Sequence, residues 1–258
     1  MNYQDIRFQM EKGLGILTLN RPEKRNALSL NLMQEIIDLL QSFRKNPEGR
    51  VLIIRAEGPA FSSGHDLAEM VGRDAFFYRQ IFDTCTEMME AIRNLPQPVI
   101  AQVQGIATAA GCQLVATCDL AVASEGARFA TPGVRIGLFC HTPQVPLSRA
   151  ISRKRALEML FTGRLITAAE AERYGLVNTV VPLERLAEET LQLARKIIEA
   201  SPLTLAMGKQ SFYRQAEFDE SGAYHYAKEI MSLNALTEDA QEGIRAFLEK
   251  RPPIWKGK

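Results

Sequence analysis

The sequence predicts an α/β protein whose core contains a largely parallel β-sheet. Short apolar runs typical of strands alternate with amphipathic runs typical of helices, and strands connected through helices run parallel to one another. No strand pattern follows residue 201, which predicts a helical region after the αβ core. With 258 residues, the chain is long enough to bury a large core in one domain with at most a small appendage.

The first half of the chain supplies strands and helices in alternation. Residues 6–20 read as two β-runs around a Lys-Gly turn. Ser29 is placed to cap a helix, because the apolar residues that follow it fall on one helical face. The run VLIIRAEG (residues 51–58) predicts a strand, residues 77–94 predict a helix, and PVIAQVQG predicts the next strand.

The alternation continues through the second half and then stops. A small-residue segment, ATAAGCQLVATC, leads into the apolar strand DLAVAS, and residues 153–181 add further helix and strand patterns. From Ser201 onward three runs read as helices, interrupted by proline and glycine. We therefore predict two parts, residues 1–200 and residues 201–258.

Composition excludes several classes of protein. Hydrophobic residues make up 46% of the chain and charged residues 24%, which is ordinary for a soluble globular protein and excludes a disordered one. The formal net charge of +1 gives no overall field that favours nucleic acid or an anionic membrane, so we predict neither as a partner. The longest apolar runs are too short to span a bilayer.

The cysteines and the first residues predict a cytoplasmic location. Cys85, Cys112, Cys118 and Cys140 lack the paired spacing of a zinc site, and a chain of this size needs no disulfides. We therefore expect reduced thiols and no bound metal. The opening residues, MNYQDIRFQMEKG, mix charged and polar residues where a secretory signal needs an apolar stretch.

Two glycine-containing segments are candidates for chemistry. In AEGPAFSSGHDLAEM a strand leads into a polar turn and a helix begins near Asp66, which leaves backbone N–H groups around Gly64 and His65 unpaired. Such groups bind anionic or polarised oxygen. In GIATAAGCQLVATCD, small residues open a helix and permit close approach of a backbone or ligand. Each segment alone also fits an ordinary strand-to-helix turn.

The order of several motifs resembles a known family. The blocks LNRPEKRNALS, FSSGHDLAEM, GIATAAGCQLVATCDLAVAS, RFATPGVRIGL, LFTGRLITAAEAERYGLVNTVV and EGIRAFLEKRPP together resemble the enoyl-CoA hydratase/isomerase, or crotonase, superfamily. FSSGHDL, ATAAGCQL and FATPGV are most similar to its enoyl-CoA hydratase domain-containing subgroup. The resemblance implies a crotonase spiral of ββα repeats over residues 1–200 and a helical region over residues 201–258 that covers CoA and packs chains into trimers or hexamers.

The resemblance also implies a ligand and a site. The ligand is an acyl-CoA thioester, with CoA as part of the substrate and no covalently bound cofactor. This ligand implies an acyl-CoA lyase, isomerase or hydrolase of fatty acid metabolism. The oxyanion hole falls on the backbone N–H groups of His65 and Ala110. The residues implied in CoA binding are Lys24, Arg25, Asn26, Ala27, Leu28 and Lys256.

Two catalytic glutamates of the family's hydratases are missing. Their positions hold Gln113 and Gly133, neither of which can act as a general base. We therefore expect weak or no enoyl-CoA hydration. Glutamate at both positions should raise hydration if the pocket is otherwise intact. We expect the His65 side chain to face solvent, with the pocket as the alternative. His141 is a candidate proton shuttle, with an ordinary loop histidine as the alternative.

Four functions therefore stay open at the level of sequence. The first is an enzyme that uses oxyanion stabilisation for decarboxylation, thioester hydrolysis or isomerisation; the GHD segment also resembles acyl-CoA decarboxylases of the superfamily. The second is a hydratase that uses unorthodox groups, and the third is a non-catalytic acyl-CoA binder. The fourth is an RNA-binding relative, which the net charge of +1 disfavours.

Overall fold

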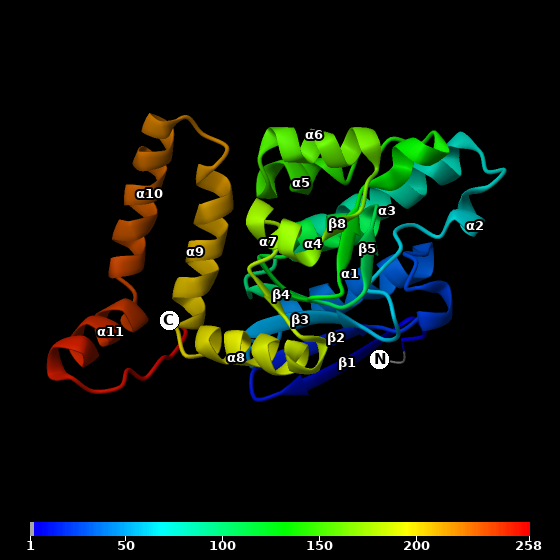
Figure 1. Cartoon of the computed structure of the whole chain (residues 1–258). Helices are drawn as coiled ribbons and strands as arrows, with labels where there is room; N and C mark the ends of the chain where they lie inside the picture. Colours follow the sequence, from blue (N-terminus) through cyan, green and yellow to red (C-terminus); the bar gives the residue numbers. More distant parts are fainter. Residues whose placement is uncertain (1–2) are drawn as a thin grey trace.

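A computed structural model describes residues 3–258 and has the α/β architecture that the sequence predicts (Figure 1). The strands are β1 (Ile6–Glu11), β2 (Leu14–Leu19), β3 (Val51–Ala56), β4 (Val99–Val103), β5 (Ile106–Thr108), β6 (Leu120–Ser124), β7 (Arg128–Ala130), β8 (Ile166–Thr167) and β9 (Thr179–Val181). The α-helices are α1 (Leu30–Arg44), α2 (Leu67–Met70), α3 (Ala75–Arg93), α4 (Ala110–Thr117), α5 (Gln144–Ala150), α6 (Arg153–Thr162), α7 (Ala168–Tyr174), α8 (Leu186–Ile198), α9 (Pro202–Gln215), α10 (Glu220–Ala235) and α11 (Glu238–Glu249). Three short 3-10 helices complete the fold: η1 (Pro22–Lys24), η2 (Pro132–Ile136) and η3 (Leu183–Arg185).

The main sheet is parallel apart from its first pair of strands. Its order is β1-β2-β3-β4-β6-β9, and only the β1–β2 hairpin is antiparallel. The predicted hairpin and the predicted crossover strands are therefore confirmed. A second sheet, with the order β5-β7-β8, was not predicted, because each of its strands has at most three residues.

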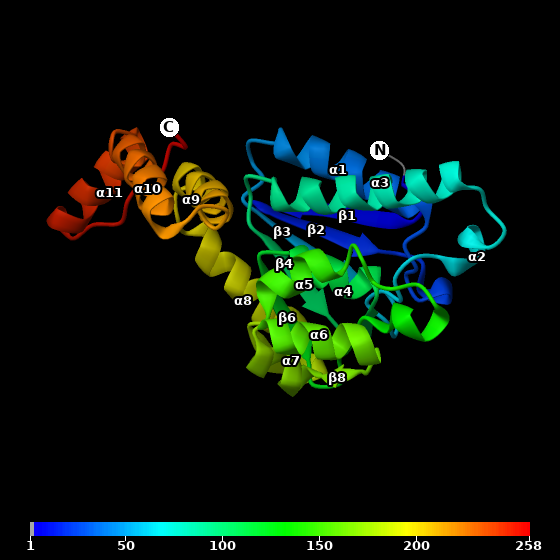
Figure 2. The same cartoon turned by 90° about the horizontal axis from the view of Figure 1, so that it is seen from above.

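Helices cover both faces of the main sheet. Helices α1 and α3 lie side by side on one face (Figure 2), where their buried apolar side chains join the main core. Ser29 caps α1 as predicted, since its Oγ accepts a hydrogen bond from the Leu32 N–H. On the other face, α8 packs against β3, β4 and β6 and buries a second apolar cluster that includes Leu186 and Ala194.

The last helices extend away from the core. Helices α9, α10 and α11 lie beside the sheet rather than over it (Figures 1 and 2), and α9 and α10 contain no buried residue. One buried ion pair ties α9 to the core, because Lys209 Nζ lies 2.7 Å from Asp119 Oδ2. Tyr213 adds a hydrogen bond of 2.8 Å to the other oxygen of the same carboxylate. The helical region is thus attached to the core through α9, α10 buries no residue, and α11 buries Asp239 and Ala246.

No helix among residues 3–258 combines the length and the apolar character that crossing a membrane requires.

Candidate active site

The two glycine-containing segments lie against each other in the folded chain. The Ser62 N–H donates to the Ile106 carbonyl at 3.1 Å, and the Thr108 N–H donates back to the Ser62 carbonyl at 2.9 Å. Thr108 Oγ1 also donates to the Ser63 carbonyl at 3.1 Å. These bonds continue the loop after β3 alongside β5, so that the loop reaches the start of α4.

Two glycines permit this close approach. Gly64 has a φ of +92°, and a Cβ at that position would lie 2.8 Å from the Ala109 Cβ and 3.2 Å from the Ala110 nitrogen. A Cβ on Gly111 would lie 2.3 Å from the Ser62 carbonyl oxygen. Any side chain at either position would force the two segments apart. The His65 segment and the Ala110 segment are therefore in direct contact.

Both predicted donors have a free N–H. Across residues 3–258, no carbonyl accepts a hydrogen bond from the backbone N–H of His65 or of Ala110. Ala110 is the first residue of α4, where the N–H groups of a helix have no partner within it. The preceding residue, Ala109, has a φ of +50° and a ψ of −118°, a conformation that costs about 1–3 kcal/mol outside glycine. Two free donors on touching segments are what an oxyanion hole requires.

The His65 side chain is turned inward. Within residues 3–258, neither ring nitrogen is exposed or has a hydrogen-bond partner. The ring packs edge-to-face on Phe82 of α3 with centroids 5.5 Å apart. The expectation that this side chain faces solvent is therefore wrong, because α3 covers it. Burial disfavours the charged imidazolium and lowers the pKa of His65 from 6.5 to about 4. The imidazole is neutral at physiological pH.

The low pKa of His65 predicts a loss of stability in acid. The unfolded chain binds a proton at His65 below pH 6.5, whereas the folded chain does not until about pH 4. The free energy of unfolding should therefore fall as the pH drops from 6.5 toward 4. In His65→Leu, which keeps the backbone donor, urea titrations over this range should show a smaller fall. The same substitution at the exposed His141 is the matched control for the loss of a histidine side chain.

Gln113 lies in the core beside the predicted hole. It belongs to α4, one turn after Ala110, and only 4% of it is exposed. The Cys85 thiol of α3 is a weak donor to the Gln113 Oε1, with the Sγ 4.0 Å from that oxygen. Burial raises the pKa of the Cys85 thiol to about 12, so the thiol stays protonated. This pair is uncharged and supplies no general base.

Gly133 has no space for a side chain. It lies in η2, and a Cβ there would be 2.0 Å from the Leu138 carbonyl oxygen and 2.9 Å from the Cys140 Sγ. The Leu138 N–H donates to the Gly133 carbonyl at 3.0 Å, which closes the loop over this position. The condition of an otherwise intact pocket is therefore not met for glutamate at this position, because the backbone occupies the volume that its Cβ needs.

His141 lies in an exposed turn after this loop. Its ring packs on Phe139 with centroids 5.1 Å apart, and no described contact joins it to His65 or Ala110. Its neighbour Cys140 is buried, and burial raises the pKa of that thiol. These contacts favour an ordinary loop histidine over a proton shuttle.

The segment implied in CoA binding pairs with the loop of the hole. Leu28 and His65 form an isolated parallel bridge, in which the Leu28 N–H donates to the Gly64 carbonyl at 2.7 Å. Asn26 is fully buried, and its side-chain amide donates to the Glu57 and Ala60 carbonyls. Its side chain is thus engaged by protein, while the exposed Lys24 and Arg25 have no ion-pair partner in the described part of the chain.

Ala27 and Lys256 complete the positions implied for CoA. Ala27 is buried and its carbonyl accepts a hydrogen bond of 2.8 Å from the Arg21 guanidinium. Lys256 is exposed on the C-terminal tail, where its Nζ lies 3.2 Å from a Glu238 carboxylate oxygen. No described contact links Lys256 to the 24–28 segment of the same chain.

Among the side chains of residues 3–258, no three histidine, cysteine, aspartate or glutamate residues are grouped as a metal site would require.

The fold and the site together define a crotonase-type protein. The family model for enoyl-CoA hydratase/isomerase matches residues 9–258, and the chain belongs to this family. It is 50% identical over 248 residues to the rat enoyl-CoA hydratase domain-containing protein 3, mitochondrial, a match that spans 96% of this chain and 83% of the relative. The predicted superfamily and subgroup are confirmed.

Solved structures confirm the predicted fold. The human enoyl-CoA hydratase domain-containing protein 3 superposes with a TM-score of 0.95 at 48% identity, covering 98% of this chain and 100% of that chain. A structure titled enoyl-CoA hydratase from Mycobacterium smegmatis superposes with a TM-score of 0.95 at 46% identity, covering 98% and 99% of the two chains.

The prediction of a cytoplasmic location is wrong. The rat, mouse and human relatives are all named as mitochondrial proteins. Cysteine patterns that favour reduced thiols separate oxidising from reducing compartments. They do not distinguish one reducing compartment from another.

Proposed function

We propose that this chain binds acyl-CoA thioesters and polarises the thioester carbonyl with the backbone N–H groups of His65 and Ala110. The observation that carries the proposal is the pair of free N–H groups on two segments in contact. Each such donor, aimed at a developing enolate oxygen, contributes about 3 kcal/mol. The exposed Lys24 and Arg25 are placed on the same 24–28 segment to meet phosphate groups.

Hydration of enoyl-CoA is expected to be weak or absent. Hydration needs a carboxylate to activate water and a second group to exchange the proton at C2. Gln113 is neutral, Gly133 has no side chain, and the His65 imidazole has a pKa of about 4 that makes it a poor base. Reactions that need chiefly enolate stabilisation, such as decarboxylation, fit these residues better than hydration does. Binding of acyl-CoA without turnover fits them as well.

A substrate panel tests this function. Purified protein is incubated with crotonyl-CoA, malonyl-type and saturated acyl-CoA thioesters, and the products are analysed by mass spectrometry. We expect saturable acyl-CoA binding and little hydration of crotonyl-CoA beside a family hydratase that has both glutamates. Hydration at the rate of that enzyme would contradict the proposal, and a decarboxylated or hydrolysed product would identify the reaction. Tight binding without any product would favour the non-catalytic binder.

We also propose that residues 201–258 form an oligomerisation region that completes the CoA site of a neighbouring copy. Large apolar side chains of α10 and α11 are mostly exposed in the single chain, among them Met231 at 72% and Phe247 at 83%. Lys256 lies on the tail that follows these helices and faces no CoA segment of its own chain. Sedimentation velocity should show a trimer or hexamer, and a monomer at micromolar concentration would contradict this assignment.

A further inference from the structure

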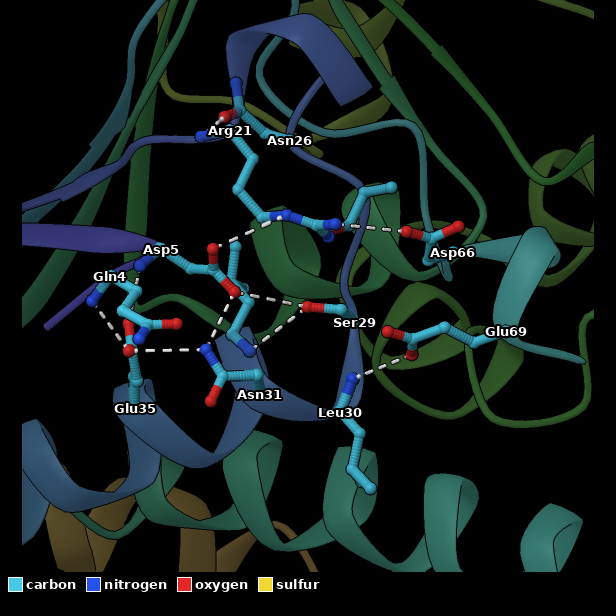
Figure 3. A network of polar contacts seen from close by, with 12 residues as sticks. Gln4, Asp5, Arg21, Asn26, Ser29, Leu30, Asn31, Glu35, Asp66 and Glu69 are labelled. Atoms are coloured by element: carbon cyan, nitrogen blue, oxygen red, sulfur yellow. Dashed lines mark hydrogen bonds and ion pairs between the residues drawn. The ribbon is translucent and has the colours of Figure 1, made fainter.

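A polar network surrounds the segment that precedes α1 (Figure 3). It joins the chain before β1, the 21–29 segment, the first turn of α1 and the loop that carries His65. Arg21 is its central cation, with a side chain only 16% exposed. The network has no assigned role, and it reaches both halves of the proposed site.

Arg21 holds the segment implied in CoA binding. Its Nη1 donates to the Ala27 carbonyl at 2.8 Å, and its backbone N–H donates to the Asn26 Oδ1 at 2.9 Å. The Asn26 N–H donates back to the Arg21 carbonyl at 2.8 Å. Arg25 and Asn26 both have positive φ values, 51° and 52°, which costs free energy that these hydrogen bonds offset. The Arg21 main chain thus holds Asn26, and its guanidinium holds the Ala27 carbonyl.

The same guanidinium holds the loop of the hole. Arg21 Nη2 lies 3.2 Å from the Asp66 Oδ2, in a pair whose aspartate side chain is 13% exposed. Asp66 follows the donor His65 directly, and its backbone N–H donates to the Leu28 carbonyl at 3.3 Å. Its other carboxylate oxygen accepts from the Ala68 N–H and caps α2. One rigid planar group thus bridges the two loop segments that pair at Leu28 and His65.

We propose that Arg21 is a positioning residue that holds the 25–28 segment and the His65 donor as one unit. Recognition of CoA and recognition of the thioester carbonyl are then coupled, since both depend on the Arg21 guanidinium. This inference rests on the proposed oxyanion hole. A lysine keeps the charge at this position but cannot make the diverging contacts to Ala27 and Asp66 at once.

The test measures the hydrogen bonding of the thioester carbonyl in the bound ligand. Infrared difference spectra of butanoyl-CoA with a carbon-13 carbonyl report its hydrogen bonding, and calorimetry gives the affinities for butanoyl-CoA and for CoA. Wild type should lower the carbonyl stretching frequency. Arg21→Lys and Asp66→Asn should each lose most of this shift and should weaken butanoyl-CoA binding about tenfold more than CoA binding. Asparagine still caps α2, so Asp66→Asn decides the matter if Arg21→Lys does not fold.

Asp5→Asn is the matched control, because Asp5 pairs with the same guanidinium at 3.6 Å on the side away from His65. It should lower the melting temperature and keep the full carbonyl shift. An unshifted carbonyl in wild type would overturn the oxyanion hole itself. A shift that survives in Arg21→Lys or Asp66→Asn would overturn the role of Arg21 alone. Loss of the carbonyl shift in Asp5→Asn to the same extent would also overturn this role, because the shift would then depend on the stability of the whole network.

Discussion

Replacing Gly111 by alanine is expected to abolish recognition of the thioester. The new methyl group would lie 2.3 Å from the Ser62 carbonyl oxygen and 2.8 Å from its Cβ. Both atoms are close to the backbone that positions His65, so relief of the clash must separate the loop from the start of α4. With one donor displaced, any turnover that forms an enolate should fall about 100-fold to 1,000-fold.

The measurement for Gly111→Ala compares the affinity for butanoyl-CoA with that for CoA, well below the melting temperature. Gly126→Ala is the control, because a Cβ at Gly126 meets nothing within 4 Å. The control should behave as wild type in both binding and stability. Undiminished preference for the thioester in Gly111→Ala would show that the two segments do not form the hole.

The sequence predicts the backbone features of the site better than it predicts where the side chains point. The strand, polar turn and helix around Gly64 and the small-residue helix start at Ala110 are local features, and the structure contains both. Local pattern carries this information because turns and helix starts depend on neighbouring residues. The contact of the two segments then follows from the bonds between Ser62 and β5.

Side-chain placement depended on packing between distant segments. The inward turn of His65 depends on Phe82, and the blocked volume at Gly133 depends on Leu138 and Cys140. The role of Arg21 could not be predicted from the sequence for the same reason. Its partners Ala27 and Asp66 come together only in the folded chain. An arginine in a polar segment has no periodicity that would reveal a bridging role.

Glutamate at position 133 is expected to damage the fold without creating a hydratase. Its Cβ would lie 2.0 Å from the Leu138 carbonyl oxygen, a backbone atom that cannot rotate away as a side chain can. Overpacking of this kind costs about 3 kcal/mol, which corresponds to a fall in melting temperature of roughly 10 °C. Gly133→Ala should show most of this loss, because the clash begins at Cβ. Gly126→Ala again supplies the control.

Gln113→Glu is expected to fold, because glutamate has nearly the shape of glutamine. Its carboxyl would be buried beside the Cys85 thiol, where burial raises the pKa of a carboxyl and keeps it partly protonated. Gln113→Glu alone should therefore leave crotonyl-CoA hydration close to the wild-type level. Combining it with Gly133→Glu should add instability rather than activity. Efficient hydration by a stable double variant would mean that the 133–138 loop can rearrange to admit a second carboxylate. The proposal that this loop prevents hydration by leaving no room for a glutamate would then be wrong.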